Sequence, residues 1–519
     1  MAVARVACRA QLGLQAPLVQ VEVSLASGLP AFCIVGLPAT VIKESKERVR
    51  AALVNSGFAF PAGRITVSLA PAELPKEGGR FDLPIALGIL LASGQLHAHL
   101  ERGRGREFYG ELGLTGELKP VRGLLLAAAH ARQQGHELIV PCGNALEACA
   151  AAPRHVRAAA HLLEVCAHLS GASAWPPHPV PPRRPATADA GTGLDLADVR
   201  GQWLAKRALV VAAAGAHSLL LIGPPGAGKT MLAQRLPGLL PPLAENEALE
   251  VAAIAAASAT GFAPERYGQR PFRAPHHSSS TAALVGGGAR ALPGEVSFAH
   301  LGVLFLDELP EFARGVLEAL REPLESGTVS VSRAVLQNRY PAAFQLIAAM
   351  NPCPCGRLGD SAAECRCTPA EIRGYRGRIS APLLDRLDMH VEVPRLAATE
   401  FSAPASGHAE STAAAAERVA RARSVQLARQ GTCNARLTDA AVQRWCDADA
   451  SGQRLLASAM ERFGLSGRAR QRVLKVARTI ADLAGTPAVT AAHVGEALRL
   501  RCLDDDPTAP SAACNRRPA

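Results

Sequence analysis

The stretch Gly223-Pro224-Pro225-Gly226-Ala227-Gly228-Lys229-Thr230 follows directly on an apolar run, residues 218–222. A buried strand that breaks into a glycine-rich turn points successive backbone N–H groups into one concavity, at the positive end of the following helix. The spacing G-x-x-x-x-G-K-T therefore predicts a loop that binds nucleotide phosphates through residues Gly223 to Met231. In this pattern Lys229 reaches the β- and γ-phosphates, and the Thr230 hydroxyl ligates Mg²⁺.

Length and composition bound the class of protein. A chain of 519 residues is too long for one core, and about 150 residues per domain suggests roughly three domains. Hydrophobic residues make up 48% of the chain and aromatic residues only 4%, so the cores must be aliphatic. The net charge of +11 suits an anionic partner, either nucleic acid or an acidic membrane surface. The alternative is that the positive charge only reflects a general bias toward arginine and implies no anionic partner.

The start of the chain and its cysteines predict a cytoplasmic protein. Residues 1–5 lead into an alternating pattern rather than the long apolar segment of a signal peptide. No run reaches the roughly 18 apolar residues that a membrane-spanning helix needs. The 13 cysteines are odd in number and scattered apart from one cluster, which fits reduced thiols better than a disulfide framework.

Residues 1–170 show a mixed α/β pattern. Polar and apolar residues alternate over 20–25 and 64–69, which predicts two half-buried strands, and residues 41–53 carry a helical apolar face between them. Residues 110–121 predict a hairpin leading to a helix over 124–132. Proline-rich residues 171–193 predict an extended linker.

This first domain resembles the proteolytic domain of Lon-type proteases, whose Pro-Lys-Asp-Gly signature precedes a nucleophilic serine. Here Pro75-Lys76-Glu77-Gly78 is followed by Arg80 or Asp82 at the serine position, and Leu124 and Leu125 stand where the lysine is expected. A Ser–Lys dyad needs a nucleophile beside a base. The resemblance therefore implies a Lon-like, S5-type α+β fold without peptidase chemistry, with a role in ring assembly or partner docking.

Two further strands complete the predicted nucleotide site within residues 194–395. The apolar run 302–306 is typical of a buried parallel strand, and ligands bind at the carboxyl ends of such strands. There Asp307 can hold the Mg²⁺ shell and Glu308 can polarise the attacking water. Residues 344–350 predict a third strand ending in Asn351, which either orients that water or serves only as a turn former before Pro352.

The order and spacing of these residues resemble AAA+ ATPases. In that class Asn351 corresponds to the polar sensor, and Arg386, in residues 382–388, to the arginine finger that reaches the neighbouring subunit's γ-phosphate. Such a contact contributes about 10³–10⁵ in rate in related enzymes, so the resemblance implies a ring. Arg468, in residues 465–468, corresponds to a sensor of the nucleotide in its own chain. It lies in a predicted α-helical lid, residues 396–505, before a disordered tail, 506–519.

More narrowly, residues 272–277, 351–356 and 476–483 resemble signatures of the ComM (YifB) family, in the Mg-chelatase-like branch of AAA+ ATPases. That family implies a hexameric, ATP- and Mg²⁺-dependent DNA branch-migration helicase that helps integrate incoming strands during natural transformation. The alternative is a chelatase-type ATPase that remodels a protein or metal-insertion partner, which shares every nucleotide-site residue. An ATP-dependent protease is opposed by the missing serine and lysine.

Two insertions bear on DNA binding. Residues 258–299 carry Arg270 and Arg273, and residues 328–339 predict a hairpin with Arg333 and Arg339. Loops of this kind project into the pore of hexameric helicases, where arginines can track a phosphate backbone. The alternative is that Arg333 and Arg339 belong to an ordinary solvated face of the protein.

Four cysteines form the one dense group in the chain: Cys353, Cys355, Cys365 and Cys367. Four thiolates in a short polar loop can close a tetrahedral zinc site. The C-x-C spacing is tighter than the usual C-x₂-C, and free thiols or a redox pair are the alternatives. Adjacent His276 and His277 are assigned to a loop or DNA contact rather than to the metal.

Overall fold

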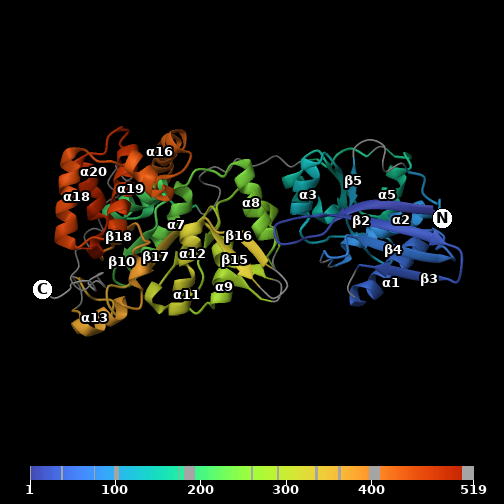
Figure 1. The fold of residues 1–519 in the computed structure, drawn as a ribbon, viewed down its shortest axis with the longest axis horizontal. Helices are drawn as coiled ribbons and strands as arrows, with labels where there is room; N and C mark the ends of the chain where they lie inside the picture. The colour runs from blue at the N-terminus through green and yellow to red at the C-terminus, as the bar shows by residue number, and fades with distance from the viewer. Residues whose placement is uncertain are drawn as a thin grey trace. The chain divides into compact units, whose positions relative to one another are not determined.

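The computed structural model describes residues 2–36, 39–74, 76, 78–98, 105–173, 175–179, 193–258, 261–288, 291–332, 337–360, 364–396 and 410–504 (Figure 1). The chain forms two compact units. The N-terminal unit comprises Met1–Arg184 with Glu245–Tyr267, and the C-terminal unit comprises Pro185–Ala244 with Gly268–Ala519. Most of the predicted linker and the whole of the predicted tail, residues 506–519, lie outside the described residues.

A mixed sheet of seven strands organises the N-terminal unit, in the order β3-β4-β2-β1-β5-β8-β9. β2 pairs antiparallel with β1 and β4, while the remaining neighbours are parallel. The two alternating strands predicted from the sequence are confirmed as β2 and β4, because every second side chain is buried along β4 and along β2 as far as Val23. The strands are β1 (Ala2–Arg9), β2 (Leu18–Ala26), β3 (Ala31–Val35), β4 (Arg64–Ala70), β5 (Arg106–Phe108), β8 (Glu137–Pro141) and β9 (Val156–Ala159).

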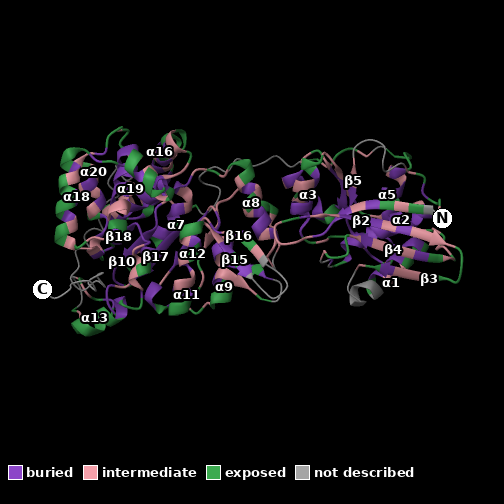
Figure 2. Ribbon diagram, viewed as in Figure 1, coloured by how far each residue is buried: buried purple, intermediate pink, exposed green. Residues whose placement is uncertain are grey.

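One helix of this unit is apolar on every side and lies in the core. α2 (Asp82–Ala92) has nearly all its residues buried, and a Cβ at Gly88 would come 2.4 Å from Val23 Cγ2, so glycine lets the helix approach the sheet closely (Figure 2). The predicted hairpin is confirmed as the antiparallel pair β6 (Glu111–Leu112) and β7 (Leu118–Lys119). The other helices are α1 (Ala39–Asn55), α3 (Leu124–Gln133), α4 (Ala145–Ala151) and α5 (Leu162–Leu169).

The N-terminal unit also contains a helix from the middle of the chain. α8 (Glu245–Ala256) contributes Ala252, Ala253 and Ala256 to the N-terminal core, and Arg132 Nη1 of α3 lies 3.2 Å from Glu245 Oε1. The sequence assigned this segment to the 194–395 domain. Contacts instead group Glu245–Tyr267 with the first domain.

The positions that correspond to a Ser–Lys dyad hold side chains with structural roles. Arg80 donates to the carbonyl oxygens of Arg9 and Arg122, while the buried Asp82 accepts hydrogen bonds from Ser45 Oγ at 2.7 Å and Arg48 Nε at 2.6 Å. Leu124 and Leu125 are buried in the core, in the first turn of α3. Asp82 thus links α2 to α1, and none of these four positions holds a serine or a lysine.

A five-stranded parallel sheet, in the order β11-β14-β17-β10-β18, forms the middle of the C-terminal unit. The three apolar runs predicted as strands are confirmed as β10, β14 and β17, and all their residues are buried (Figure 2). Loops that follow these strands therefore emerge at one edge of the sheet. The strands are β10 (Leu219–Ile222), β11 (Phe272–Arg273), β14 (Val303–Leu306), β17 (Gln345–Met350) and β18 (Met389–Glu392).

Helices surround this sheet, and those of the predicted lid form one core with it. Two antiparallel hairpins, β12 (Gly286–Gly287) with β13 (Leu292–Pro293) and β15 (Thr328–Ser332) with β16 (Gln337–Pro341), complete the unit, the second as predicted. The helices are α6 (Trp203–Gly215), α7 (Lys229–Leu239), α9 (Thr281–Val285), α10 (Glu295–Phe298), α11 (Arg314–Ala319), α12 (Arg321–Ser326), α13 (Pro369–Arg376), α14 (Ala381–Leu384), α16 (Thr412–Gln430), α17 (Asp439–Trp445), α18 (Ala450–Phe463), α19 (Gly467–Leu483) and α20 (Ala491–Arg499).

A buried carboxylate anchors the lid helix α19 to the sheet. Asp388, just before β18, accepts from Arg472 Nη1 of α19 at 2.5 Å and from the Ser218 backbone N–H at 2.9 Å. Burial raises the pKa of Asp388, but Arg472, His217 and the Ser218 N–H outweigh it, so the pKa lies well below the ordinary value. The charged form is therefore the one that stabilises the fold.

We expect Asp388→Asn to destabilise the C-terminal unit by about 3 kcal/mol at neutral pH, the lower end for a broken buried pair, because Arg472 keeps some access to water. Since the folded pKa is lowered, this contribution is complete above the unfolded value, about 3.9, and declines as pH falls below it. Chemical denaturation of both proteins at pH 7 and pH 3.5 measures the difference. A difference in unfolding free energy between wild type and variant that is larger at pH 3.5 than at pH 7 would contradict the stabilising role of the Asp388 carboxylate.

Candidate active site

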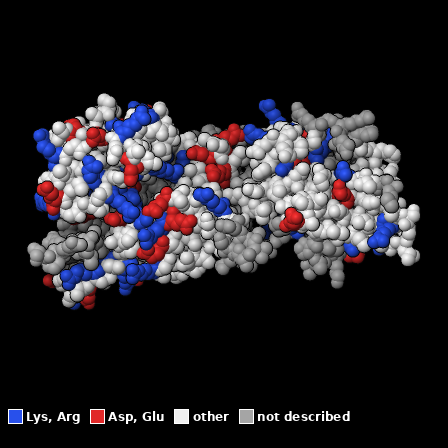
Figure 3. Space-filling view, viewed as in Figure 1, with Lys and Arg blue, Asp and Glu red and all other residues white. Residues whose placement is uncertain are grey.

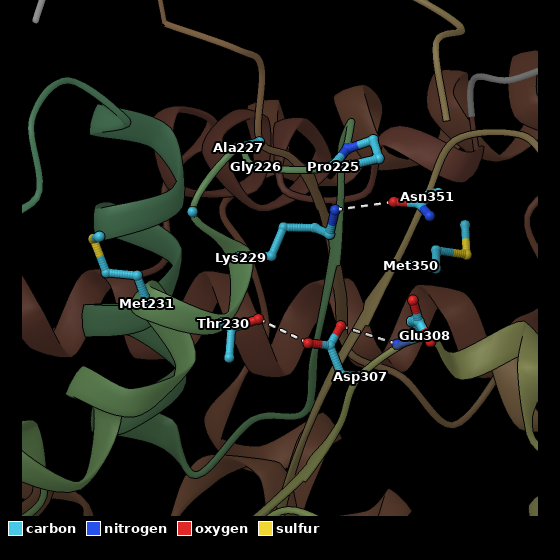
Figure 4. Close-up of a pocket in the computed structure, with 11 residues that line it drawn as sticks. Pro225, Gly226, Ala227, Lys229, Thr230, Met231, Asp307, Glu308, Met350 and Asn351 are labelled. Carbon is cyan, nitrogen blue, oxygen red and sulfur yellow. Dashed lines mark hydrogen bonds between the residues drawn. The ribbon is translucent and has the colours of Figure 1, made fainter. Parts of the chain in front are cut away.

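The glycine-rich loop lies between β10 and α7, as predicted, and encloses open space. Gly226 and Gly228 have φ values of 77° and 93°, and a Cβ at either would meet no atom within 4 Å. Left-handed backbone at both positions turns the loop so that it can wrap an anion. The loop lines a cavity of about 340 Å³ together with two strand ends (Figure 4). The lining residues are Pro225, Gly226, Ala227, Gly228, Lys229, Thr230, Met231, Asp307, Glu308, Met350 and Asn351.

Lys229 is buried in this loop with its ammonium group facing three oxygens. Nζ donates to the carbonyl oxygens of Gly223 at 2.7 Å and Pro224 at 3.0 Å, and to Asn351 Oδ1 at 3.2 Å. Burial lowers the pKa of Lys229, and the charges of Asp307 and Glu308 oppose that shift. Carbonyls and an amide leave the positive charge uncompensated, which favours an anionic ligand.

The residues predicted to hold Mg²⁺ lie together. Thr230 Oγ1, in the first turn of α7, donates to Asp307 Oδ2 at 2.7 Å, just after the end of β14 (Figure 4). The other oxygen, Oδ1, accepts the Glu308 N–H at 3.0 Å. A hydroxyl and a carboxylate beside a phosphate loop form an oxygen donor set that suits Mg²⁺, which usually keeps waters and substrate phosphates as its other ligands.

Glu308 has a partner that the sequence did not reveal. The residue adopts φ 53°, and His277 Nδ1 lies 3.2 Å from its Oε2. His277 follows β11, which pairs with β14, so both loops emerge at the same edge of the sheet. The centroids of the His276 and His277 rings lie 4.1 Å apart, and the rings of His277 and Phe312 form a T-shaped pair. His277 thus lies beside the Glu308 carboxylate, and the loop or DNA-contact role predicted from the sequence stays a prediction.

The four cysteines predicted as a metal site come together in the loop after Asn351. The Sγ atoms of Cys353, Cys355, Cys365 and Cys367 all lie within 4.8 Å of one another. The Arg357 backbone N–H, followed by the neighbouring thiols of Cys353 and Cys367, lowers the pKa of Cys355 to about 6. The lowered pKa belongs to Cys355 alone, because the neighbouring thiols raise the pKa of Cys365 and Cys367.

The two arginines carried over from AAA+ ATPases lie apart from the cavity lining. Arg386 is buried, donates to the Pro382 carbonyl at 2.7 Å and pairs with Glu325 of α12. Arg468 is exposed in the first turn of α19, one turn before Arg472, which is anchored at the strand-start edge of the sheet. Arg468 is not among the residues that line the cavity of the phosphate loop, and its role as a sensor stays a prediction.

The predicted DNA-contacting arginines divide into two groups. Arg270 donates to the carbonyl oxygens of Pro241 and Leu301, and Arg273 forms a two-point pair with Glu295 at 2.6 and 2.7 Å. These contacts favour roles in the fold for both. Arg339 is exposed on β16 and donates to Thr328 Oγ1, whereas Arg333 lies outside the described residues.

A parallel sheet whose strand ends bring together a phosphate loop, an Asp–Glu pair and an asparagine defines an AAA+ P-loop ATPase. Three family models match: magnesium chelatase subunit ChlI over residues 195–401, subunit ChlI of Mg-chelatase over 21–144, and the ChlI C-terminal region over 409–501.

Individual relatives match along nearly the whole chain. The competence protein ComM of Haemophilus influenzae is 48% identical over 506 residues, covering 97% of this chain and 98% of its own. The protein YifB of Salmonella typhimurium is 48% identical with the same coverage, and YifB of Escherichia coli is 46% identical. The chain therefore belongs to the ComM/YifB family of Mg-chelatase-like AAA+ ATPases.

Proposed function

We propose that this protein is a ring-forming, ATP-driven DNA motor that migrates branched DNA during natural transformation or recombination. The observation that carries the ATP-driven part is the pair of hydrogen bonds, Lys229 to Asn351 and Thr230 to Asp307, that joins three strand ends around one cavity. The DNA part is supported by the relative named a competence protein, which matches over 97% of the chain. Among the described residues no helix has the length and apolar character to cross a membrane, and we propose a cytoplasmic location.

In this proposal the chain's own residues carry out ATP hydrolysis. Thr230 and Asp307 would hold Mg²⁺, which when bound neutralises charge on the phosphates. Lys229 turns from the carbonyls of its loop to the β- and γ-phosphates. Glu308, whose carboxylate is positioned by His277, polarises the attacking water. Asn351 orients the same water. A structural Zn²⁺ held by the four cysteines completes the set of cofactors.

A ring, most simply a hexamer, would complete this site between subunits. Arg386 lines a second cavity of about 460 Å³ with Glu318, Arg321, Glu322, Glu325 and Ser326, away from its own nucleotide loop. We propose that Arg386 leaves Glu325 to meet the neighbour's γ-phosphate. Arg468 is exposed and does not line the cavity of its own chain, and we propose that it likewise acts across a subunit boundary.

DNA contact is assigned to the β15–β16 hairpin. On the face shown in Figure 3, basic and acidic side chains are interspersed over the C-terminal unit, so a single broad basic patch does not explain DNA binding there. In this hairpin Arg339 is exposed on β16, and the predicted second arginine, Arg333, lies outside the described residues. A pair of arginines can follow a phosphate backbone without reading sequence.

Replacing both hairpin arginines, Arg333→Ala with Arg339→Ala, is expected to weaken DNA binding and to reduce the slope of log K against log salt by about two, one for each lost phosphate contact. Fluorescence anisotropy over a salt series measures both. Arg421→Ala, an exposed arginine on α16, is the matched control. ATP hydrolysis without DNA should persist in both variants. An unchanged slope in the double variant would remove the hairpin from the proposal.

A second candidate function, an ATPase that remodels a protein partner, is favoured by the magnesium chelatase models that match the chain. The ATP hydrolysis rate with and without branched DNA separates the two. A DNA motor predicts stimulation, whereas a protein remodeller predicts the same rate in both conditions.

A further inference from the structure

The loop between β17 and α13 carries four thiols, two near each end. The Sγ–Sγ distances are 3.4 Å for Cys353 and Cys355, and 3.6 Å from Cys365 to each of them. A tetrahedral zinc ion with Zn–S bonds of about 2.3 Å needs thiolates about 3.8 Å apart. A disulfide instead needs about 2.05 Å. The spacing therefore matches ligands around one ion.

The surroundings of the cluster agree with a metal–thiolate centre. The Leu358 N–H points at Cys353 Sγ over 3.4 Å, and such N–H···S contacts orient and stabilise thiolate ligands. The group consists only of sulfur ligands, which select zinc over hard cations such as Mg²⁺.

The same loop is attached to the nucleotide site. Asn351 lies two residues before Cys353, and a Cβ at Gly356, just after Cys355, would come 2.7 Å from Pro225 Cδ of the phosphate-binding loop. The Gly356 backbone thus packs directly on that loop. A shift of the cysteine loop would move both the asparagine and the surface on which Pro225 rests.

Several contacts hold this loop in its described part. Arg376 Nε donates to the Pro352 carbonyl at 3.1 Å, Asp360 lies 3.7 Å from Arg395, and the capping box of Thr368 and Glu371 starts α13 immediately after Cys367. The loop has no helix or strand among its described residues between β17 and α13. An ion held by thiols near both ends of the loop would add a direct link between the segment after β17 and the start of α13.

We infer that Cys353, Cys355, Cys365 and Cys367 bind one Zn²⁺ that clamps Asn351 and the phosphate-binding loop in the geometry needed for hydrolysis. The inference deepens the proposed function, on whose ATP site it rests. The ion is structural and takes no part in the reaction.

The test compares metal content with nucleotide turnover in the full chain. Protein purified without added metal should contain one zinc per chain by mass spectrometry, and substitution with Co²⁺ should give the intense thiolate–cobalt absorption of a tetrahedral sulfur site. The double variant Cys365→Ser with Cys367→Ser should lose the bound zinc and the cobalt absorption. Because a misplacement of about 1 Å can cost about 10²-fold in rate, ATP hydrolysis should fall by that order.

Cys142→Ser with Cys433→Ser is the matched control, since these free cysteines lie outside the cluster; it should keep both zinc and activity. Zinc added back to chelator-treated wild type should restore hydrolysis, which separates metal loss from misfolding. Chain without zinc as purified, or zinc-free wild type that hydrolyses ATP at the full rate, would overturn the inference. All assays omit DNA, so failure of the DNA-motor proposal leaves these outcomes unchanged.

Discussion

Glu308→Gln is expected to lower the rate of ATP hydrolysis about 10²- to 10⁴-fold while leaving ATP binding intact, because the carboxylate acts as a general base and the amide cannot. Glu308 stands at the end of β14, and the hydrogen bonds described above for Lys229 and Thr230, the residues proposed to bind the phosphates, go to other groups. The amide keeps the size of the side chain, so the loop and the Asp307 contact should remain. Steady-state hydrolysis measures the loss of turnover, and titration with a fluorescent nucleotide measures whether ATP binding is kept.

Glu311→Gln provides the matched control for this variant. Glu311 lies one turn further on, exposed and paired with Arg378, and exposed pairs contribute little to stability. Its hydrolysis rate should equal that of the wild type. If Glu308→Gln also hydrolysed ATP at the wild-type rate, another group would be the base.

Arg386→Ala should reduce hydrolysis about 10³- to 10⁵-fold, the effect of removing an arginine finger in related enzymes. The defect should be confined to turnover, since Arg386 does not line the cavity of its own chain. Arg378→Ala, an exposed arginine nearby, should have little effect.

Mixing two inactive variants distinguishes action between subunits from a structural role. In a mixed ring, a subunit with Arg386→Ala keeps Glu308 and can receive Arg386 from a neighbour that carries Glu308→Gln. Activity should therefore reappear in the mixture, which also shows that both variants fold and assemble. A mixture as inactive as its parts would place Arg386 in the fold of its own subunit, where it already pairs with Glu325.

The grouping of the candidate site residues around one cavity could be predicted closely because each part has a local signal. Apolar runs gave β10, β14 and β17, and the residues that end these runs come together since parallel strands share one edge. Cys353 to Cys367 were found for the same reason, as a dense local pattern.

Features that depend on pairing between distant segments were not predicted. His277 reaches Glu308 only because β11 lies beside β14, which no local pattern in the sequence records. The alanine-rich face of α8 fits any aliphatic core, so the sequence could not show that it packs in the N-terminal one. Arg468 has the residue type and position of a sensor, but the anchoring of α19 through Arg472 and Asp388 determines where it lies.

The most direct test of the DNA-motor proposal is the movement of a labelled, synthetic branched junction by the purified protein. We predict that the wild type resolves the junction only with ATP and Mg²⁺, and that Glu308→Gln binds the junction without moving it. Full ATP hydrolysis with no junction movement and no stimulation by DNA would contradict the account and favour the protein-remodelling ATPase.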